Sequence, residues 1–263
     1  MPENHRLLVV GMLSFAIFAS GARSECPRAD EILASLTQID RSQTARVELF
    51  SDGISAQMYA KAAATPGRPF ARRRGSRFAG VIVVGLPVEP LWKAVSDEEH
   101  FDEDNGYLPL AVSRLIDGEP RAVRRTLLQS FNKWGIGRWW VAEARSNAEL
   151  FERSGGKLWE VRWREQTDRY DASQPPLREL AERFKKLPLN RGAWLLVPVA
   201  SDCTIVEYVG HQEPGGFIGM MQWLLAKREV RRAMRGMVAL ATEHIPAVHG
   251  EDRFLRPDGS ALD

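Results

Sequence analysis

The sequence has little net charge and none of the short motifs that mark the common catalytic sites. Its 263 residues include 36 Lys and Arg against 34 Asp and Glu, a formal net charge of +2. That charge is too small to suggest nucleic-acid binding. The chain has no Gly-x-Ser-x-Gly elbow, no His-Glu-x-x-His motif, no phosphate-binding loop and no dinucleotide fingerprint. We therefore predict no catalytic residue and no cofactor from motifs.

Metal-binding patterns are also lacking. The histidines that follow the N-terminal segment are scattered without ligand spacing, so we expect no metal site; they are His100, His211, His244 and His249. The acidic stretch 97–104 lacks the Gly and the closing Glu of an EF-hand loop. A solvated helix end is the favoured interpretation of this stretch, and a cation site is the alternative.

No Ser/Gly-rich linker and no internal repeat divides the chain. Hydrophobic residues make up 44% and charged residues 27% of it, which predicts a packed core rather than disorder. We interpret residues 47–248 as one domain, residues 25–46 as an N-terminal arm or helix, and residues 249–263 as a C-terminal tail.

The first 24 residues have the pattern of a secretory signal peptide. His5 and Arg6 precede an apolar run over residues 7–19, and small residues follow it. We expect cleavage before Glu25, with cleavage after Ala22 as the alternative, and hence a periplasmic or secreted protein. The apolar run is short of the roughly 20 residues of a transmembrane helix, and an uncleaved N-terminal membrane anchor is the alternative.

The two cysteines lie far apart in the sequence. Cys26 is near the start of the expected mature chain, and Cys203 lies in the hairpin expected before the long C-terminal helix. An oxidising compartment permits a disulfide that ties the N-terminal arm to the sheet. Two unpaired cysteines are the alternative.

Local patterns predict an α+β fold. Apolar and β-branched segments separated by turn signals predict strands over residues 76–85, 111–116, 122–130, 138–144, 158–165, 191–199 and 204–209. A short Pro-initiated helix is expected over residues 86–97, and apolar residues at helical spacing predict a long helix over about 217–245. The natural partner of this amphipathic helix is the concave face of a sheet built from the preceding strands.

This ordered set of segments resembles the START-like lipid-transfer superfamily. Residues 86–97 resemble its first helix, which follows a strand and ends at an Asp, and residues 51–59 resemble the opening strand of the longer START domains. Its closing hairpin and the start of its last helix are resembled by four segments of this chain: Gly192-Ala-Trp194, Pro198, Glu207-Tyr208 and residues 214–218. The similarity to this SRPBCC, helix-grip or polyketide-cyclase-like group covers about residues 47–244. It implies a curved antiparallel β-sheet wrapped around a long C-terminal α-helix. The charged insert 170–188 departs from the family and is either a helix beside the cavity mouth or a loop.

The resemblance implies a cavity between the sheet and the C-terminal helix that binds a lipid or another hydrophobic small molecule, and it raises transfer between membranes as an extension. Strand alternation places Trp159, Val161 and Trp163 on one face, which we expect to point inward. The candidate lining residues are Trp139, Val141, Trp159, Val161, Trp163, Leu195, Val197, Tyr208, Met220, Trp223, Met234 and Met237. For each of them an ordinary core position is the alternative.

Two other functions stay open. A cyclase- or aromatase-like enzyme would use Glu207, Tyr208 and Arg162 as acid–base groups, and a filled interior would indicate an interaction module. The helix residues Arg228, Arg232 and Arg235 share one face. With residues 72–74 and Arg77 they are candidates for transient contact with anionic head groups, and a solvated outer face is the alternative. The sequence does not determine the oligomeric state.

Overall fold

The structure is a computed structural model that describes residues 26–101, 110–133, 136–213, 216–248 and 253–262. It describes the side chains within these ranges except those of residues 133, 136, 216–225 and 248. The expected signal peptide lies outside the described residues. None of the helices in the described part of the chain is both long and apolar enough to span a membrane.

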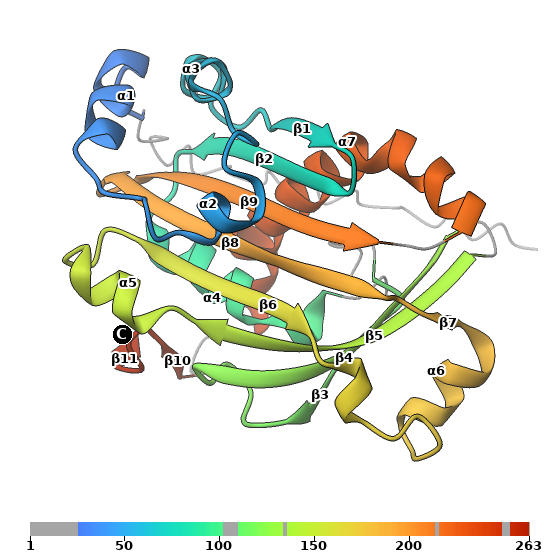
Figure 1. Ribbon diagram of the computed structural model, residues 1–263. Coiled ribbons are helices and arrows are strands. Elements are labelled where there is room, and N and C mark those ends of the chain that lie inside the picture. The colour runs from blue at the N-terminus through green and yellow to red at the C-terminus, as the bar shows by residue number, and fades with distance from the viewer. Residues whose placement is uncertain (1–25, 102–109, 134–135, 214–215, 249–252, 263) are drawn as a thin grey trace, which may run out of the picture.

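A curved sheet of nine strands forms the centre of the molecule (Figure 1). Its spatial order is β1-β2-β9-β8-β6-β5-β4-β3, with every neighbouring pair antiparallel, and β7 pairs with β5 in parallel. The strands are β1 (Phe70–Arg74), β2 (Arg77–Val84), β3 (Val112–Asp117), β4 (Arg124–Lys133), β5 (Ile136–Ser146), β6 (Trp159–Glu165), β7 (Lys185–Lys186), β8 (Leu189–Ala200) and β9 (Cys203–Glu213).

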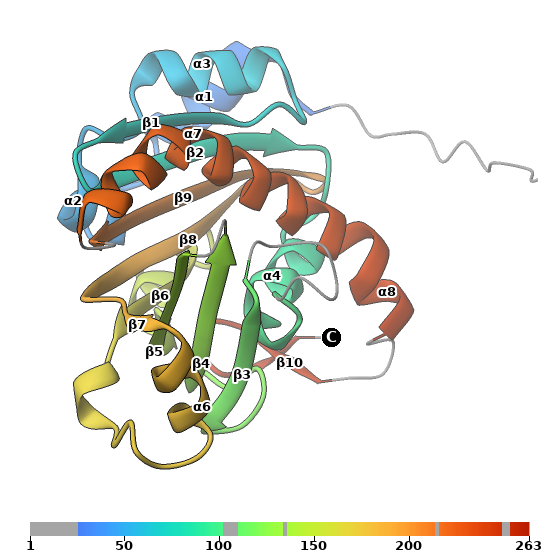
Figure 2. The ribbon, with the colours of Figure 1, turned by 90° about the vertical axis from the view of Figure 1, so that its right-hand side faces the viewer.

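Helices cover both faces of the sheet. Figures 1 and 2 show α1 (Ala29–Thr37), α2 (Ala45–Phe50) and α3 (Ala56–Ala64) on one face, which we call the outer face. The long helix α7 (Gly216–Ala239) and the short helix α4 (Val88–Ser96) lie on the other, the inner face. The remaining elements are η1 (Glu98–His100), α5 (Ala148–Arg153), η3 (Thr167–Arg169), α6 (Leu177–Arg183), the π-helical η4 (Leu240–His244), α8 (Ile245–Val248) and the hairpin of β10 (Phe254–Leu255) and β11 (Ala261–Leu262).

Strand alternation divides the apolar side chains between two principal cores. In β8, Trp194 and Leu196 point to the inner core under α7 and α4, whereas Leu195 and Val197 point to the outer core under the N-terminal helices. Helix α7 packs closely because β2 has a glycine beneath it. A Cβ atom at Gly80 would lie 2.6 Å from Met234 Sδ and 2.6 Å from Val230 Cγ1. The C-terminal half of α7 therefore rests directly on the sheet.

The N-terminal layer is joined covalently to the sheet. Cys26, just before α1, forms a disulfide with Cys203 at the start of β9, and their Cα atoms are 5.2 Å apart. Buried apolar residues of the three helices, including Ile32 and Phe50, pack against the same face. This layer is therefore part of the folded body.

The predicted α+β helix-grip fold is confirmed, since all seven predicted strands, the short helix and the long C-terminal helix are present. The predicted opening strand 51–59 is wrong, because α3 begins at Ala56 and Ser55 caps it by accepting a hydrogen bond from Met58 N. Strand β1 was not predicted, because its run of three arginines lacks the apolar alternation of a strand. In the insert 170–188, α6 packs through Leu177 and Leu180 against the outer face of β4 and β5.

Candidate ligand-binding site

Four aromatic side chains lie together on the inner face of the sheet, and we call them the aromatic platform. They are Phe78 of β2, Tyr208 of β9, Trp194 of β8 and Trp163 of β6. The ring of Tyr208 lies 5.7 Å from Phe78, 4.3 Å from Trp194 and 5.6 Å from Trp163, measured between centroids. The platform therefore continues across four neighbouring strands.

Two glycines let the rings at the two ends of the platform, Trp163 and Phe78, lie against the strand backbone. A Cβ atom at Gly192 would lie 2.2 Å from Trp163 Cζ2 and 2.4 Å from the carbonyl oxygen of Val209. A Cβ atom at Gly210 would lie 2.3 Å from Phe78 Cε2. These contacts are much shorter than van der Waals distance, so any larger residue would lift the rings. Glycine at both positions therefore allows the two rings to pack directly on the backbone of β8 and β9.

The platform is covered unevenly. Phe78 and Trp194 are buried, whereas Trp163 and Tyr208 are half-buried. Trp163 Nε1 donates a hydrogen bond to Asn190 Oδ1 at 3.2 Å, which fixes the indole in place. Burial raises the pKa of the Tyr208 hydroxyl, so it is a neutral donor. No hydrogen bond of this hydroxyl to another described side chain is present.

A second polar feature lies on the inner face of β3, β4 and β5. Trp140 Nε1 donates to Gln129 Oε1 at 3.1 Å, and Gln129 Nε2 donates to Ser113 Oγ at 3.1 Å. All three residues are buried. The tryptophan of β5 that points to the inner face is thus Trp140, whereas the sequence analysis named its neighbour Trp139. This chain of hydrogen bonds satisfies the polar groups of an otherwise apolar wall.

The part of the inner face under the second half of α7 is filled. Met234 and Met237 have no exposed surface and pack in the inner core with Val230. Trp159 packs edge-on against Trp92 of α4, with ring centroids 5.6 Å apart. These predicted lining residues are therefore core positions, together with Val161.

Four of the predicted lining residues lie on the wrong face. Trp139 and Val141 of β5 pack on the outer face with Leu177 and Leu180 of α6. Leu195 and Val197 of β8 pack under the N-terminal helices. The sequence period of two separates the faces of a strand but does not say which face a helix covers. Met220 and Trp223 lie outside the side chains that the structure describes.

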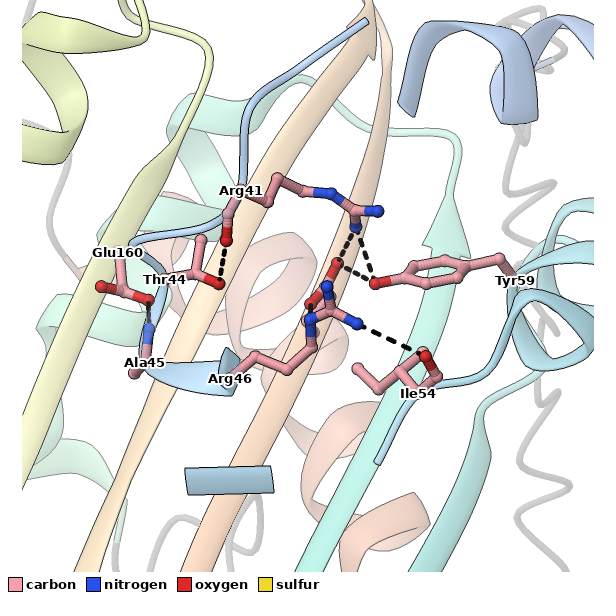
Figure 3. Close-up of polar contacts among 8 residues, drawn as sticks. Arg41, Thr44, Ala45, Arg46, Ile54, Tyr59 and Glu160 are labelled. Carbon is pink, nitrogen blue, oxygen red and sulfur yellow. Dashed lines mark hydrogen bonds and ion pairs between the residues drawn. The ribbon is translucent and has the colours of Figure 1, made fainter. Parts of the chain in front are cut away.

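The outer face holds a buried polar cluster, shown in Figure 3. Glu207 Oε1 accepts hydrogen bonds from the Tyr59 hydroxyl at 2.5 Å and from Arg41 at 2.9 Å, and Arg46 Nε lies 3.6 Å from Glu207 Oε2. Burial and the Glu207 carboxylate both raise the pKa of Tyr59. Glu207 therefore anchors the N-terminal layer.

A second buried carboxylate reinforces this anchor. Glu160 of β6 accepts a hydrogen bond from the backbone N–H of Ala45 at 2.7 Å (Figure 3). It accepts another from the side-chain amide of Asn147 at 2.8 Å. Burial raises the pKa of Glu160, against the opposing effect of Arg162. Glu207 and Arg162 thus face away from Tyr208, so the three residues considered for acid–base chemistry do not form one site.

The acidic stretch at the end of α4 is also unlike its prediction. Asp97 and Glu98 are buried rather than solvated. Glu98 Oε2 accepts a hydrogen bond from Arg125 Nε at 2.7 Å, and Arg121 Nε lies 3.5 Å from Asp97 Oδ1. Buried carboxylates require such partners. Residues 102–104 of the stretch lie outside the described residues.

A pocket of about 190 Å³ opens elsewhere in the described part of the chain, between the α1–α2 connection and α5. Polar and charged side chains, including Gln43, Arg153 and Lys157, line it. Such walls do not suit an apolar ligand, so the aromatic platform remains the better candidate.

No family model matches the chain, and no curated protein matches it. Among solved structures, human StAR-related lipid transfer protein 5 superposes with a TM-score of 0.51 at 11% identity, over 82% of this chain and 98% of that one. A STAR-related lipid transfer protein from Xanthomonas axonopodis has a TM-score of 0.49 at 19% identity, over 68% and 92% of the two chains. The Zhui aromatase/cyclase from Streptomyces sp. R1128 has a TM-score of 0.42 at 11% identity, over 69% and 98%. The superposition on the human protein shows that this chain has the START-like helix-grip fold.

Proposed function

We propose that this protein binds a hydrophobic small molecule, a lipid, against the aromatic platform and carries it between membranes. The observation that carries the proposal is the pair of half-buried aromatic residues, Trp163 and Tyr208, on the inner face of a helix-grip sheet. Neighbouring aromatic rings that stay partly uncovered form a contiguous apolar surface, and such surfaces mark ligand-binding grooves. A ligand that covers them gains roughly 25 cal/mol for each Å² of apolar surface removed from water.

The Tyr208 hydroxyl supplies the polar contact that orients the ligand. Ligand sites of this type combine apolar walls with a small number of placed polar groups. A neutral phenol donates a hydrogen bond to a carbonyl, ester or hydroxyl oxygen without the desolvation cost of a charged group. The solved structure named for lipid transfer that shares this fold supports a lipid as the ligand.

The ligand is sought first by native mass spectrometry of the purified protein, followed by organic extraction and identification of any co-purifying lipid. A stoichiometric lipid adduct is the expected result. A ligand-free mass, with no uptake from a mixture of phospholipids, sterols and fatty acids, would refute the proposal. The protein would then be an interaction module with a filled interior.

Variants test where the ligand lies. Trp163→Arg introduces a charge into the platform and is expected to abolish uptake, and Tyr208→Phe is expected to weaken uptake about 10-fold through the loss of one hydrogen bond. Tyr170→Phe is the matched control, because Tyr170 packs on the outer face beside α6. Unchanged uptake by a folded Trp163→Arg protein would exclude the platform as the site.

Delivery to a membrane is favoured by the charge of α7. Five basic residues in the central part of this helix are exposed: Lys227, Arg228, Arg231, Arg232 and Arg235. Glu229 is the one acidic residue between them. Each basic residue near an anionic surface contributes about 1 kcal/mol of attraction. Flotation with vesicles should show binding that needs anionic lipid and is lost in an Arg228→Glu, Arg232→Glu variant. Equal binding to neutral vesicles would refute this docking mode.

The proposed compartment is the periplasm or the exterior of the cell. Two observations support it: the signal-like pattern of residues 1–24 and the disulfide between Cys26 and Cys203. Disulfides persist in oxidising compartments and are rare in the cytosol. N-terminal sequencing of the protein recovered from a periplasmic extract tests this, and a chain that begins at Glu25 is the expected result.

A further inference from the structure

Three potential metal ligands from distant parts of the sequence meet beside the inner core. Asp97 ends α4, His100 lies in η1, and His244 is the last residue of η4 near the end of the C-terminal helix. Each offers one ligand atom, and these atoms all lie within 4.8 Å of one another. The rings of His100 and His244 are 4.6 Å apart between centroids, and His100 Nδ1 is 2.8 Å from Asp97 Oδ2.

The surroundings hold the carboxylate of Asp97 firmly. Its side chain is only 1% exposed, and Arg121 Nε lies 3.5 Å from its other oxygen, Oδ1. Arg121 has a positive φ of 61°, an unfavourable conformation for a residue with a Cβ atom. Its guanidinium also lies over the ring of Phe254, 4.6 Å from the centroid. The two oxygens of Asp97 therefore face different partners, and Oδ2 is directed toward His100.

We propose that Asp97, His100 and His244 bind a zinc ion. Zinc takes imidazole nitrogen and carboxylate oxygen ligands at about 2.0–2.2 Å, and such a tetrahedron separates its ligand atoms by about 3.3 Å. The ligand atoms here reach that spacing through small side-chain rotations. Arg121, 3.5 Å from Asp97 Oδ1, would orient the carboxylate through the oxygen that does not bind the ion. Two imidazoles in the set favour zinc over magnesium and calcium, which prefer oxygen ligands.

The bound ion would join the end of the C-terminal helix to the end of α4. Both elements already pack against each other through the inner core, which includes Leu240, Ala241 and Trp92. The zinc site is separate from the aromatic platform and contains none of its residues. Its expected effect is therefore on the stability of the helix on the sheet, whichever ligand the protein carries.

The test uses the full chain with any affinity tag removed and with metal stripped by a chelator. Titration with Zn²⁺ against a chromophoric competitor should show one site per chain, and elemental analysis should confirm the stoichiometry. Zn²⁺ should raise the Tm and Mg²⁺ should leave it unchanged. Co²⁺ in the same site should give the intense visible absorption of a tetrahedral nitrogen and oxygen environment.

Variants separate this site from adventitious binding. His100→Gln and His244→Gln should each weaken zinc binding by about 100-fold or more, and Arg121→Gln should weaken it by about 10-fold to 100-fold. His211→Gln is the matched control, because His211 lies in β9 beside Arg191. It should bind zinc like the wild type.

Two results would overturn the proposal. One is a wild-type protein that binds less than one zinc per chain at 100-fold excess of metal over protein. The other is a His100→Gln, His244→Gln double variant that keeps the wild-type affinity. Asp97→Asn, which preserves the size of the side chain, replaces either histidine variant that fails to fold. A wild-type Co²⁺ complex without tetrahedral absorption would refute the geometry independently of every variant.

Discussion

Removal of the disulfide is expected to destabilise the protein by several kcal/mol. Cys26 and Cys203 are separated by 177 residues, so the bond closes a very long loop in the unfolded chain. The chain-entropy relation for a loop of this length gives about 5 kcal/mol at 25 °C as a ceiling, and native disulfides typically contribute about 2–4 kcal/mol. We expect a loss of about 2–5 kcal/mol in the free energy of unfolding.

The measurement is urea unfolding of the wild type and of a Cys26→Ala, Cys203→Ala double variant, with and without reductant. Alanine suits position 203 because that side chain is fully buried, and serine would leave a hydroxyl there. Reductant should destabilise the wild type and leave the double variant unchanged. The eight tryptophans give a fluorescence signal for the transition.

The reasoning would be refuted by a double variant with the same free energy of unfolding as the oxidised wild type. Titration of two free thiols in the unfolded, unreduced wild type would refute it more directly. The first result would mean that the N-terminal layer is held by its apolar and polar contacts alone. The second would also remove one support for an oxidising compartment.

Three further perturbations test the packing and the electrostatics of the sheet. Glu207→Ala leaves the half-buried cations Arg41 and Arg46 without their carboxylate. It should cost about 3 kcal/mol in urea unfolding, the lower end of the range for a buried pair; an unchanged midpoint would contradict the cluster. Gly192→Ala forces a Cβ atom into the ring of Trp163 and should cost about 1–3 kcal/mol, with a shift in tryptophan fluorescence as the second readout. Burial and Arg191 lower the pKa of His211, so the unfolded chain takes up a proton below about pH 6.5 more readily than the native protein. Stability should therefore fall on acidification from pH 7 to pH 5, and His211→Gln should show a shallower fall; identical slopes would mean that His211 is not the group responsible.

The sequence by itself determined the elements of the inner half of the fold. The alternation of Trp159, Val161 and Trp163 predicts β6, and the apolar spacing from Val230 to Ile245 predicts the C-terminal helix. These signals are local, because the periods of a strand and a helix repeat within a few residues. The order of the elements resembled the START-like superfamily, and that resemblance implied the helix-grip fold. The platform residues Trp163 and Tyr208 were among the candidate lining residues.

Only the tertiary structure decided which face each strand turns to the C-terminal helix. Trp139 and Leu195 belong to strands with good apolar patterns, yet they pack on the outer face. The facing of a strand depends on its register with neighbours and on the helices that cover it, and neither is encoded within the strand. The N-terminal helices that bury the outer face were the part of the chain that local patterns described least well.

The polar sites depended on tertiary structure even more strongly. The sequence pattern predicts an outward charge at Glu207, but in the structure α2 and α3 cover this residue. It likewise predicts a solvated helix end at Asp97, which is buried beside Arg121 and the C-terminal helix. His244 meets His100 only because the long helix returns across the sheet to the end of α4. Contacts between residues so far apart in the sequence leave no local pattern, because they are made by the packing of whole elements and not by the spacing of residues within one.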